Sequence, residues 1–478
     1  MNQRTVFVSG IFNILHPGHL RLLRFAKESG DRLIVGVESD KAVGNLSHIN
    51  ERLRLDGVQS NSYVDDAFII EGPVIDVLKI IQPQVVVKGR EHEDRFNPEA
   101  EVIKSYGGKL IFCSGETTFS SLDLIRKEFK KIDSGSILLP DEFMIRHGIL
   151  ANRLSGILKS FKDLKICVIG DLIVDEYITC QPLGISQEDP AIVVTPLDSS
   201  KFLGGAGIVA AHGAGLGAVV EFFSVVGADE AGEYSRKELQ SAGVDACIFV
   251  DEGRPTTLKQ RYRSNGKSLF RVSHLHQNSI SIDLQEKILT ALKKSLSDSD
   301  VLIFSDFNYG CLPQRLVDQI IEIAKNSKVL IAADSQSSSQ IGDICRFKGL
   351  DLITPTEREA RVAARNREDG LVILAEQVQK HSGAKIVFLK LGAEGLLIHR
   401  DADEKDSLIT DRIGSLNCAP KDVAGAGDSM LIISALTLAK GGTVWEAAML
   451  GSLAAAVQVS RVGNTPLNLE DLLKELNL

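Results

Sequence analysis

Two histidines three residues apart, His16 and His19, lie in a stretch with glycine and proline, 10–19, that follows a short apolar run. Pro17 suits the first position of a helix, because the N–H group that it lacks would have no partner there. We therefore expect a strand, a tight loop and a helix over 5–28. The first turn of a helix has unpaired N–H groups and the positive end of the dipole, which attract phosphate. Two imidazoles at that place can donate to charge that builds up on a phosphoryl oxygen, which is the chemistry of nucleotidyl transfer.

Two simpler interpretations of the histidine pair remain open. A histidine near a helix start is often a cap or a surface residue, and a His-x-x-His spacing also occurs in metal sites, although two ligands alone make an incomplete site. The segment 31–37 favours the phosphate interpretation, since its apolar run predicts a second strand. Strand, helix and strand then form a βαβ unit with the histidines at the carboxyl end of its first strand, where such units bind nucleotides.

Composition and charge limit the classes of protein to which this chain belongs. The net charge of −9, without a basic and aromatic-rich stripe, argues against a nucleic-acid surface. The seven cysteines lie far apart, with no Cys-x-x-Cys spacing and several inside apolar runs, so we expect reduced core residues. The amino terminus lacks the apolar stretch of a signal peptide, and no apolar run reaches about 18 residues. These features predict a cytoplasmic protein with no membrane or nucleic-acid partner.

Two unlike alternations of strand and helix divide the 478 residues. In the first alternation, apolar runs predict five strands near 5–9, 33–37, 67–70, 85–88 and 109–113. The regular order ends at 129–140, after which one helix over 141–159 is expected to lead to a new strand at 166–170. We therefore predict three segments, which are an α/β domain, a linker with its bridging helix and a larger α/β domain: 1–130, 131–160 and 161–478.

Four pieces of the first segment occur together in one known family. They are Gly10-x-Phe12-Asn13-x-x-His16-x-Gly18-His19, the strand from Asp31 to Asp40, Val87-Lys88-Gly89 and Ser120-Ser121. Together they resemble the cytidylyltransferase-like nucleotidyltransferases. The resemblance implies that His16 and His19 are catalytic, and that five further residues contact the nucleotide: Gly10, Phe12, Gly18, Lys88 and Ser120. Asn13 stands where this family usually has Asp, and Leu122 stands where a second Thr is common.

A second phosphate loop is predicted near the other end of the chain. Gly425, Ala426 and Gly427 directly precede Asp428, and an apolar helical run, 429–439, follows. The glycines let backbone N–H groups close on an anion, and the helix start adds its dipole. At that place a carboxylate can accept a proton from a sugar hydroxyl as a γ-phosphoryl group arrives. The structural alternative is a glycine-rich turn in which the aspartate only caps the helix.

The neighbours of this loop in the second segment also carry a resemblance. They are Gly170-Asp171-x-x-x-Asp175, Gly204-Gly205-Ala206-Gly207, Thr354-Pro355-Thr356-x-x-Glu359 and the stretch 422–428. Over 160–470 the chain resembles the ribokinase-like sugar kinases of the phosphofructokinase-B type. The resemblance implies that Asp428 is the catalytic base, that 425–427 form the anion hole and that Glu359 belongs to a Mg²⁺ network. It also implies sugar contacts from six residues: Asp171, Asp175, Gly204, Gly205, Lys259 and Arg261.

The same resemblance implies a small β lid, built from 176–196 and 256–272, that covers the sugar. In this family the lid often forms the dimer, so we expect a homodimer. Lid residues Lys259, Arg261, Arg263 and Arg271 would face the sugar if the lid brings them inward.

Four positions depart from the pattern of these kinases. Ile208 occupies the place of an Asn that usually touches the sugar, and Thr356 replaces the Asn of the Asn-x-x-Glu motif. Tyr309 and Gln336 stand where lysines are common. A cation paired to phosphate is a charge-assisted contact of about 1.5–3 kcal/mol, so two missing lysines weaken the binding of a doubly anionic sugar phosphate. These departures therefore leave the identity of the sugar substrate open.

The two resemblances predict an α/β protein, with a Rossmann-like nucleotidyltransferase domain followed by a ribokinase-like domain with a small β lid. The pair resembles the bifunctional enzymes of bacterial heptose activation, with the domain order exchanged. Such an enzyme phosphorylates the anomeric hydroxyl of a sugar or sugar phosphate with Mg²⁺ and ATP, and then joins the sugar 1-phosphate to a nucleotide. ATP is the expected nucleotide, and CTP is the alternative. Two other hypotheses are an active transferase with a catalytically silent kinase-like module for sugar binding or dimerisation, and an inactive scaffold.

Overall fold

The computed structural model describes most of the chain, and the described residues are 4–12, 15, 17–43, 49–89, 97–113, 137–186, 188–189, 191–264, 267–337, 342–401 and 409–476. By their contacts the residues group into two compact units. One unit comprises Met1–Ser134, Arg365–Gln377 and Asp401–Arg412, and the other comprises Gly135–Ala364, Val378–Arg400 and Ile413–Leu478. Each unit is described by itself.

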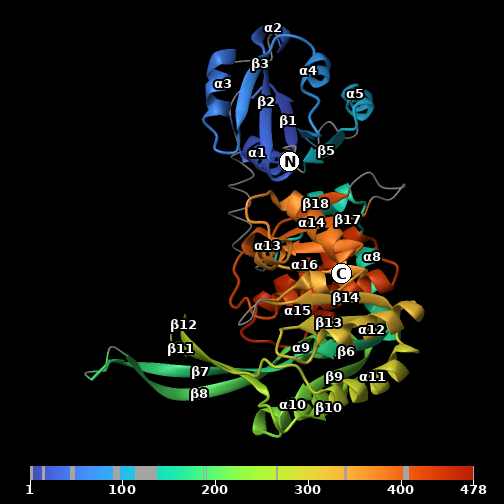
Figure 1. Ribbon diagram of the computed structural model, residues 1–478. Helices are drawn as coiled ribbons and strands as arrows, with labels where there is room; N and C mark the ends of the chain where they lie inside the picture. Colours follow the sequence, from blue (N-terminus) through green and yellow to red (C-terminus); the bar gives the residue numbers. More distant parts are fainter. Residues whose placement is uncertain are drawn as a thin grey trace. The chain divides into compact units, whose positions relative to one another are not determined.

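A parallel sheet in the order β3-β2-β1-β4-β5 forms the centre of the amino-terminal unit (Figure 1). Its strands are β1 (Thr5–Gly10), β2 (Arg32–Glu38), β3 (Asp66–Ile70), β4 (Val85–Gly89) and β5 (Lys109–Cys113). These bounds confirm the five strands that the apolar runs predicted. The strand order reverses direction between β1 and β4, so the loop after β1 lies at the switch point where such sheets bind ligands.

Helices cover both faces of this sheet. They are α1 (Pro17–Glu28), α2 (Asp40–Val43), α3 (Glu51–Gln59), α4 (Val74–Ile81) and α5 (Glu99–Ser105). Val6 and Val8 pack in one core cluster with Leu23 of α1, whereas Phe7 packs in the other with Leu78 of α4. Because successive side chains of a strand point to opposite faces, a strand covered on both sides needs an uninterrupted apolar run. The helix α1 begins at Pro17, as the position of the proline predicted.

The single bridging helix predicted over 141–159 is wrong. The structure has two helices, α7 (Asp141–Arg146) and α8 (Ala151–Lys159). Gly148 separates them in the left-handed backbone region, at φ +60°, and the N–H of Ile149 donates to the carbonyl of Met144 at 2.8 Å. This pattern is a glycine-dependent helix end, so the glycine stops the helix although the residues on both sides favour one.

The centre of the second unit is the run β10-β9-β6-β13-β14-β15-β16-β17 of a nine-stranded sheet whose last strand is β18. Its strands pair in parallel from β10 to β16, and β17 pairs antiparallel with β16. The bounds are β6 (Lys165–Gly170), β9 (Val219–Val226), β10 (Asp245–Val250), β13 (Val301–Asp306), β14 (Leu330–Ser335), β15 (Leu352–Ile353), β16 (Ile386–Lys390), β17 (Leu396–Arg400) and β18 (Thr410–Ile413). Loops that follow the parallel strands therefore meet at one edge of the sheet.

Helices α9, α15 and α16 pack on one another and on this sheet, and α11 and α12 form another packed pair. The helices α15 and α16 are apolar on all sides and almost fully buried, as expected for core helices. The remaining helical bounds are η3 (Ser160–Asp163), α9 (Ala206–Gly215), α10 (Glu230–Ser241), α11 (Ile282–Leu296), α12 (Gln314–Asn326), η4 (Ile344–Arg346), α13 (Glu357–Ala364), α14 (Leu371–Ser382), η5 (Gly392–Glu394), α15 (Ala426–Ala439), α16 (Val444–Val459) and α17 (Leu469–Glu475).

A second sheet of the same unit, in the order β12-β11-β7-β8, projects from its body as a long ribbon (Figure 1). Its strands are β7 (Leu172–Ile185), β8 (Ile192–Gly205), β11 (Thr257–Ser264) and β12 (Lys267–His274). This arrangement confirms the small β lid that the resemblance implied. One residue, Asp171, separates β6 from β7, so the lid continues directly from a central strand of the large sheet.

Two further findings concern membrane-spanning helices and cysteines in the described residues. Among them, no helix combines the length and apolarity that crossing a membrane requires. Six cysteines in this part of the chain have free thiols, and four of these are buried. Cys247 is partly buried and Cys418 is exposed, which corrects the expectation of core cysteines for these two.

Candidate active sites

The loop after β1 places Phe12 against His19. Phe12 is buried, and its ring centroid lies 5.1 Å from that of His19. Its backbone has φ +51°, which is uncommon for a bulky residue and is typical of strained functional loops. A Cβ atom at Gly10 would lie 3.3 Å from the Phe12 ring, so a glycine there leaves room for the ring. The described part of this loop thus holds His19 in the first turn of α1 through an aromatic contact.

Arg54 of α3 anchors the same loop, and sequence reasoning missed it. Its side chain is fully buried and donates to the carbonyl of Ile11. The same guanidinium donates to the carbonyl of Glu38 at 2.9 Å and to Oδ1 of Asp40 at 2.7 Å. A buried arginine with several acceptors fixes a loop strongly, because each lost contact would leave a desolvated polar atom. Arg54 therefore joins the loop after β1 to the end of β2.

The other predicted residues of the first site have different outcomes. Lys88, at the end of β4, is a largely buried lysine whose Nζ forms an ion pair with Oε1 of Glu99 at 2.8 Å. Nζ also lies 3.2 Å from Oδ1 of Asn97. Its predicted contact with a phosphate would need an anion to compete with Glu99. His16 and Ser120, and the side chain at position 18, lie outside the described residues.

The second site centres on Asp428, in the first turn of α15. Gly425 precedes this helix in the left-handed region, at φ +76°, and the first-turn N–H groups of a helix have no intrahelical partner. Asp428 is only 5% exposed. Burial, with the nearby carboxylate of Asp334, raises the pKa of Asp428 to about 7. The helix starts at Ala426 rather than at the predicted 429, so this carboxyl lies inside the first turn, at the carboxyl-terminal edge of the parallel strands.

The side chains of Gln336, Asp334 and Lys390 form the surroundings of this carboxyl. The amide of Gln336 donates to Oδ1 of Asp428 at 3.1 Å and lies 3.4 Å from Oδ2 of Asp334. The ammonium of Lys390 lies 3.0 and 2.9 Å from the two oxygens of Asp334. The predicted base therefore lies beside a second buried carboxylate that a lysine neutralises.

Asp175 lies on β7 at the base of the lid. Asn464 lies between it and the anion loop, 425–427. Nδ2 of Asn464 donates to Oδ2 of Asp175 at 3.3 Å. Oδ1 of each residue is buried without a hydrogen-bond partner among the described residues. A Cβ atom on Gly204 would clash with Asp175, and one on Gly425 would clash with Asn464. Buried oxygens without donors normally find a partner, and sugar hydroxyls are suitable donors.

Two of the predicted lid cations point toward this place. Nη2 of Arg261 lies 3.6 Å from Oδ1 of Asp175. Nζ of Lys259 lies 5.0 Å above the ring of Phe307 and 5.1 Å above that of Tyr309. Burial raises the pKa of Asp175, and the two cations oppose that rise. The lid therefore places the positive charges of Lys259 and Arg261 at its base, which is the inward position expected for them.

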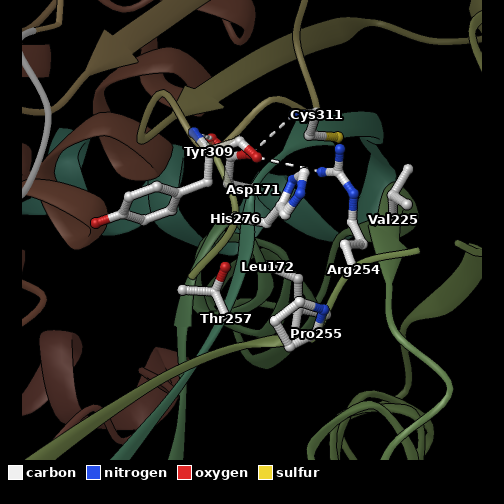
Figure 2. Close-up of a pocket in the computed structure, with 9 residues that line it drawn as sticks. All are labelled: Asp171, Leu172, Val225, Arg254, Pro255, Thr257, His276, Tyr309 and Cys311. Carbon is white, nitrogen blue, oxygen red and sulfur yellow. Dashed lines mark hydrogen bonds between the residues drawn. The ribbon is translucent and has the colours of Figure 1, made fainter. Parts of the chain in front are cut away.

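Asp171 has a different environment from the one predicted. Its Oδ2 accepts from the N–H groups of Phe307 and Tyr309 at 2.8 and 3.2 Å, and its Oδ1 accepts from Cys311 at 3.1 Å. Figure 2 shows this carboxyl beside Tyr309 and Cys311, with Arg254 directed at the same loop. These residues line a cavity with an empty volume of about 270 Å³, its open mouth included. Backbone donors occupy both oxygens of Asp171, so this side chain fixes the loop 307–311.

Glu359 also binds backbone. Its Oε1 accepts from the N–H of Ser337 and its Oε2 from that of Thr356, each at 2.8 Å. Among the described residues no group of three or more acidic, histidine or cysteine side chains could hold a metal ion. Mg²⁺ usually keeps several waters and binds through substrate phosphates and one or two carboxylates. Glu359 and Asp334 fit such a water-mediated arrangement, because carboxylate oxygens can accept further hydrogen bonds.

Of the four departures from the kinase pattern, Gln336 is polar and donates to Asp428, and the other three differ in character. Ile208 is fully buried in α9, and Tyr309 is buried beneath Lys259. Thr356 keeps a polar role, because its hydroxyl accepts from the N–H of Glu359 at 3.3 Å. The structure thus replaces the expected polar groups by packing at two positions and retains a local hydrogen bond at the third.

Sequence profiles of two known families match the two parts of the chain. Residues 163–471 match the pfkB family carbohydrate kinases, and residues 7–136 match the cytidylyltransferase-like family. A bifunctional protein HldE of Desulfatibacillum aliphaticivorans is 28% identical over 320 residues. A bifunctional protein HldE of Helicobacter hepaticus is 30% identical over the same length. Each alignment spans 66% of this chain and 64% of the relative, which is less than two thirds of the relative's length.

Solved structures share the fold of the second unit. The ribokinase of Arabidopsis thaliana complexed with ribose and ATP matches with a TM-score of 0.52 and 18% identity, over 66% of this chain and 99% of that one. The phosphofructokinase-2 of Escherichia coli in complex with substrates and products matches with a TM-score of 0.52 and 16% identity, over 66% and 98%. Identities this low show the fold alone.

Proposed function

Because the chain belongs to the pfkB family of carbohydrate kinases, we propose that it phosphorylates the anomeric hydroxyl of a sugar or sugar phosphate with ATP. We further propose that its amino-terminal unit transfers a nucleotidyl group to the resulting sugar 1-phosphate, with release of pyrophosphate. The main support is Asp428, a buried carboxyl in the first turn of α15 with a pKa near 7. A general base works best when its pKa lies near the working pH.

The kinase step follows from the groups around Asp428. Its carboxylate takes the proton of the sugar hydroxyl as that oxygen attacks the γ-phosphorus, and the bond to the β-phosphate oxygen breaks with ADP as the leaving group. The N–H groups around Gly425 and Gly427 face charge that builds on the transferred phosphoryl group. Gln336 holds the carboxyl through its hydrogen bond of 3.1 Å. Mg²⁺, when bound with the nucleotide, neutralises phosphate charge.

The sugar lies, in this proposal, at the base of the lid. The Oδ1 atoms of Asp175 and Asn464, which accept no hydrogen bond from the described residues, accept from its hydroxyls, and Gly204 leaves the space that a side chain would fill. Lys259 and Arg261 supply positive charge for an anionic substituent such as the phosphate of a heptose 7-phosphate-like substrate. We now assign Asp171 to loop positioning instead of sugar contact, because three backbone N–H groups occupy it.

The transferase step uses His19, with His16 assigned from the sequence motif alone. Both imidazoles donate to the oxygens of the attacked α-phosphate, and the N-terminal turn of α1 adds its dipole. ATP is the proposed nucleotide, through the resemblance of the paired domains to the enzymes of bacterial heptose activation, and relatives of the chain are described as bifunctional proteins. CTP is the alternative, since the amino-terminal match is to a cytidylyltransferase-like family.

We also propose a homodimer formed through the lid. Large apolar side chains are exposed on β7, β8 and β12, which are Leu183, Ile185, Ile192, Leu197, Phe270 and Val272. Exposed apolar side chains gathered on one small sheet are typical of an interaction surface. A second copy of the chain is the proposed occupant, and sedimentation of the full chain measures it.

One specific observation favours a silent kinase-like module as the second candidate. Gln336 and Tyr309 replace lysines that this family commonly has, so two cations near the phosphates are absent. A module that only binds carbohydrate would need the lid and its cations. It would not need a titratable carboxyl at Asp428.

A one-pot assay separates these proposals. The full chain is incubated with Mg²⁺, ATP or CTP, and a panel of hexoses, heptoses and their phosphates, and products are identified by mass spectrometry. From sugars without a 1-phosphate we expect a nucleotide sugar with the native chain, sugar 1-phosphate alone with His19→Ala, and neither with Asp428→Asn. The exposed residues Asp318 and His381 offer matched controls, because Asp318→Asn and His381→Ala should leave both products. Product formed only from supplied sugar 1-phosphates, equally in Asp428→Asn, would establish the silent module.

A further inference from the structure

Lys390 is a buried cation whose position no sequence motif had singled out. It ends β16, and its side chain is only 12% exposed. Its ammonium pairs with both oxygens of Asp334, at 3.0 and 2.9 Å, and Asp334 is itself 1% exposed. Burial alone would lower the pKa of Lys390, but the carboxylates of Asp334 and Glu359 outweigh this and raise it. The ammonium therefore keeps its charge at any pH at which the enzyme works.

The ammonium lies directly beside the proposed anion hole. A Cβ atom built on Gly427 would come within 3.0 Å of Nζ of Lys390. Gly427 is the second residue of α15, and Asp428 follows it. The glycine therefore leaves the ammonium uncovered by a side chain beside the helix start, whose N–H groups attract phosphate.

We propose that Lys390 contacts the γ-phosphoryl group of ATP and supplies the positive charge that related kinases usually place at the positions of Gln336 and Tyr309. This inference rests on the proposed kinase activity and adds a catalytic residue to it. Gln336 and Lys390 both contact Asp334, Gln336 through a hydrogen bond of 3.4 Å, so the two side chains reach the same place, one from the end of β16 and one from the residue after β14. A cation lost at one position is thus replaced at the other.

Lys390 acts in this step as a fixed charge. Negative charge on the transferred phosphoryl group rises as the bond to ADP breaks, and an ammonium beside it stabilises that charge. The proton of the sugar hydroxyl goes to Asp428, and Lys390 keeps its own protons throughout. Asp334 orients the ammonium through its two contacts at 3.0 and 2.9 Å.

The structural alternative is that Lys390 only neutralises Asp334. Nucleotide binding distinguishes the two roles without knowledge of the sugar, because a γ-phosphate contact affects ATP but not ADP. The experiment measures, by calorimetry on the full chain with Mg²⁺, the dissociation constants of ADP and of a non-hydrolysable ATP analogue. For Lys390→Gln we expect about 10- to 100-fold weaker binding of the analogue and less than about 3-fold change for ADP.

Removing Lys390 leaves Asp334 buried and unpaired, which is strongly destabilising, so a second variant is required. The double variant Lys390→Gln with Gln336→Lys moves the ammonium across Asp334 and keeps the pair. We expect it to restore the preference for the ATP analogue to within about 10-fold of native. Lys385→Gln is the matched control, because Lys385 pairs with Asp351 at an exposed site next to β16 and should not change either constant.

Each result decides the proposal. An unchanged analogue affinity in folded Lys390→Gln, an equal loss for both nucleotides, or a folded double variant that does not regain the preference would overturn the role of Lys390. A native chain that binds neither nucleotide would instead overturn the proposed kinase function on which it rests.

Discussion

The side-chain amide of Gln336 joins two buried carboxyl groups, with Nε2 at 3.1 Å from Oδ1 of Asp428 and at 3.4 Å from Oδ2 of Asp334. Two carboxylates this close to one neutral donor cannot both be ionised cheaply without a cation. Lys390 supplies that cation to Asp334, and Asp428 keeps a raised pKa. The neutral amide therefore holds the proposed base in place without neutralising its charge. A lysine at position 336 would neutralise that charge.

The pH dependence of the kinase step follows from Asp428. The base must be deprotonated, and its pKa is raised to about 7 by burial and by Asp334. We expect kcat/KM for the sugar to rise tenfold per pH unit below about 7 and to reach a plateau above it. Initial rates between pH 5 and 9 at fixed Mg²⁺ measure this. A profile that is flat down to pH 5 would mean that the base has an ordinary aspartate pKa. That result would contradict the raised pKa expected from its burial beside Asp334.

The same carboxyl should cost stability when it ionises. Its folded-state pKa of about 7 lies above the ordinary value of 3.8, so the folded chain binds this proton more tightly. Its contribution to the free energy of unfolding falls as the pH rises from about 3.8 to about 7, and the full destabilisation is present above about 7. Asp428→Asn should therefore stabilise the second unit by about 1–4 kcal/mol at pH 8 and change it little at pH 4. Urea unfolding at both pH values tests the sign, and a destabilised variant at pH 8 would refute it.

Arg54 should be needed for the transferase step only. Arg54→Ala removes the donors for Ile11 and Glu38, and each unsatisfied buried acceptor costs about 1–3 kcal/mol. We expect transferase activity to fall at least about 100-fold through the misplaced loop, while ATP-dependent sugar phosphorylation continues. Arg32→Ala is the matched control, because Arg32 pairs with Asp66 at an exposed site worth at most about 1 kcal/mol. Equal effects of the two variants on transfer would exclude the anchoring role.

Asp175 should decide sugar affinity. Asp175→Asn keeps the shape of the side chain but replaces one acceptor by a donor, so we expect the KM for the sugar to rise about 10- to 100-fold. The KM for ATP should stay within about 2-fold of native, because no described contact joins Asp175 to the anion loop except through Asn464. Asp198→Asn, at an exposed position on the same lid, serves as the control. A change confined to the KM for ATP would place the sugar elsewhere.

Local sequence signals predicted the parts of the fold that depend on neighbouring residues. Apolar runs such as 5–9 predicted the strands, because a strand covered on both faces must be apolar at every position. Pro17 predicted the start of α1 through its missing N–H group. The break between α7 and α8 was missed although Gly148 was visible, since the apolar spacing on both sides outweighed a single glycine.

Contacts between distant residues could not be read from the sequence in the same way. Asp175 and Asn464 are separated by 289 positions, and only the fold brings their side chains together. Lys390 ends an apolar strand and shows no local motif, and the partners of Arg54 lie as far as 43 positions away. The sugar contact predicted for Asp171 shows the opposite limit, because its motif is local while its three backbone donors come from the loop after β13.

The central claim is that Asp428 is the base of a working anomeric kinase, and ³¹P NMR of the kinase step alone tests it most directly. The full chain is incubated with Mg²⁺, ATP and each sugar of the panel, and the product phosphate is located by its coupling to the anomeric proton. The account predicts an anomeric phosphate, as the sugar 1-phosphate or as the nucleotide sugar made from it, that forms with the native chain and with Asp318→Asn, and a rate at least about 1,000-fold lower with Asp428→Asn. Phosphate on another hydroxyl, or equal rates for the native chain and Asp428→Asn, would contradict it.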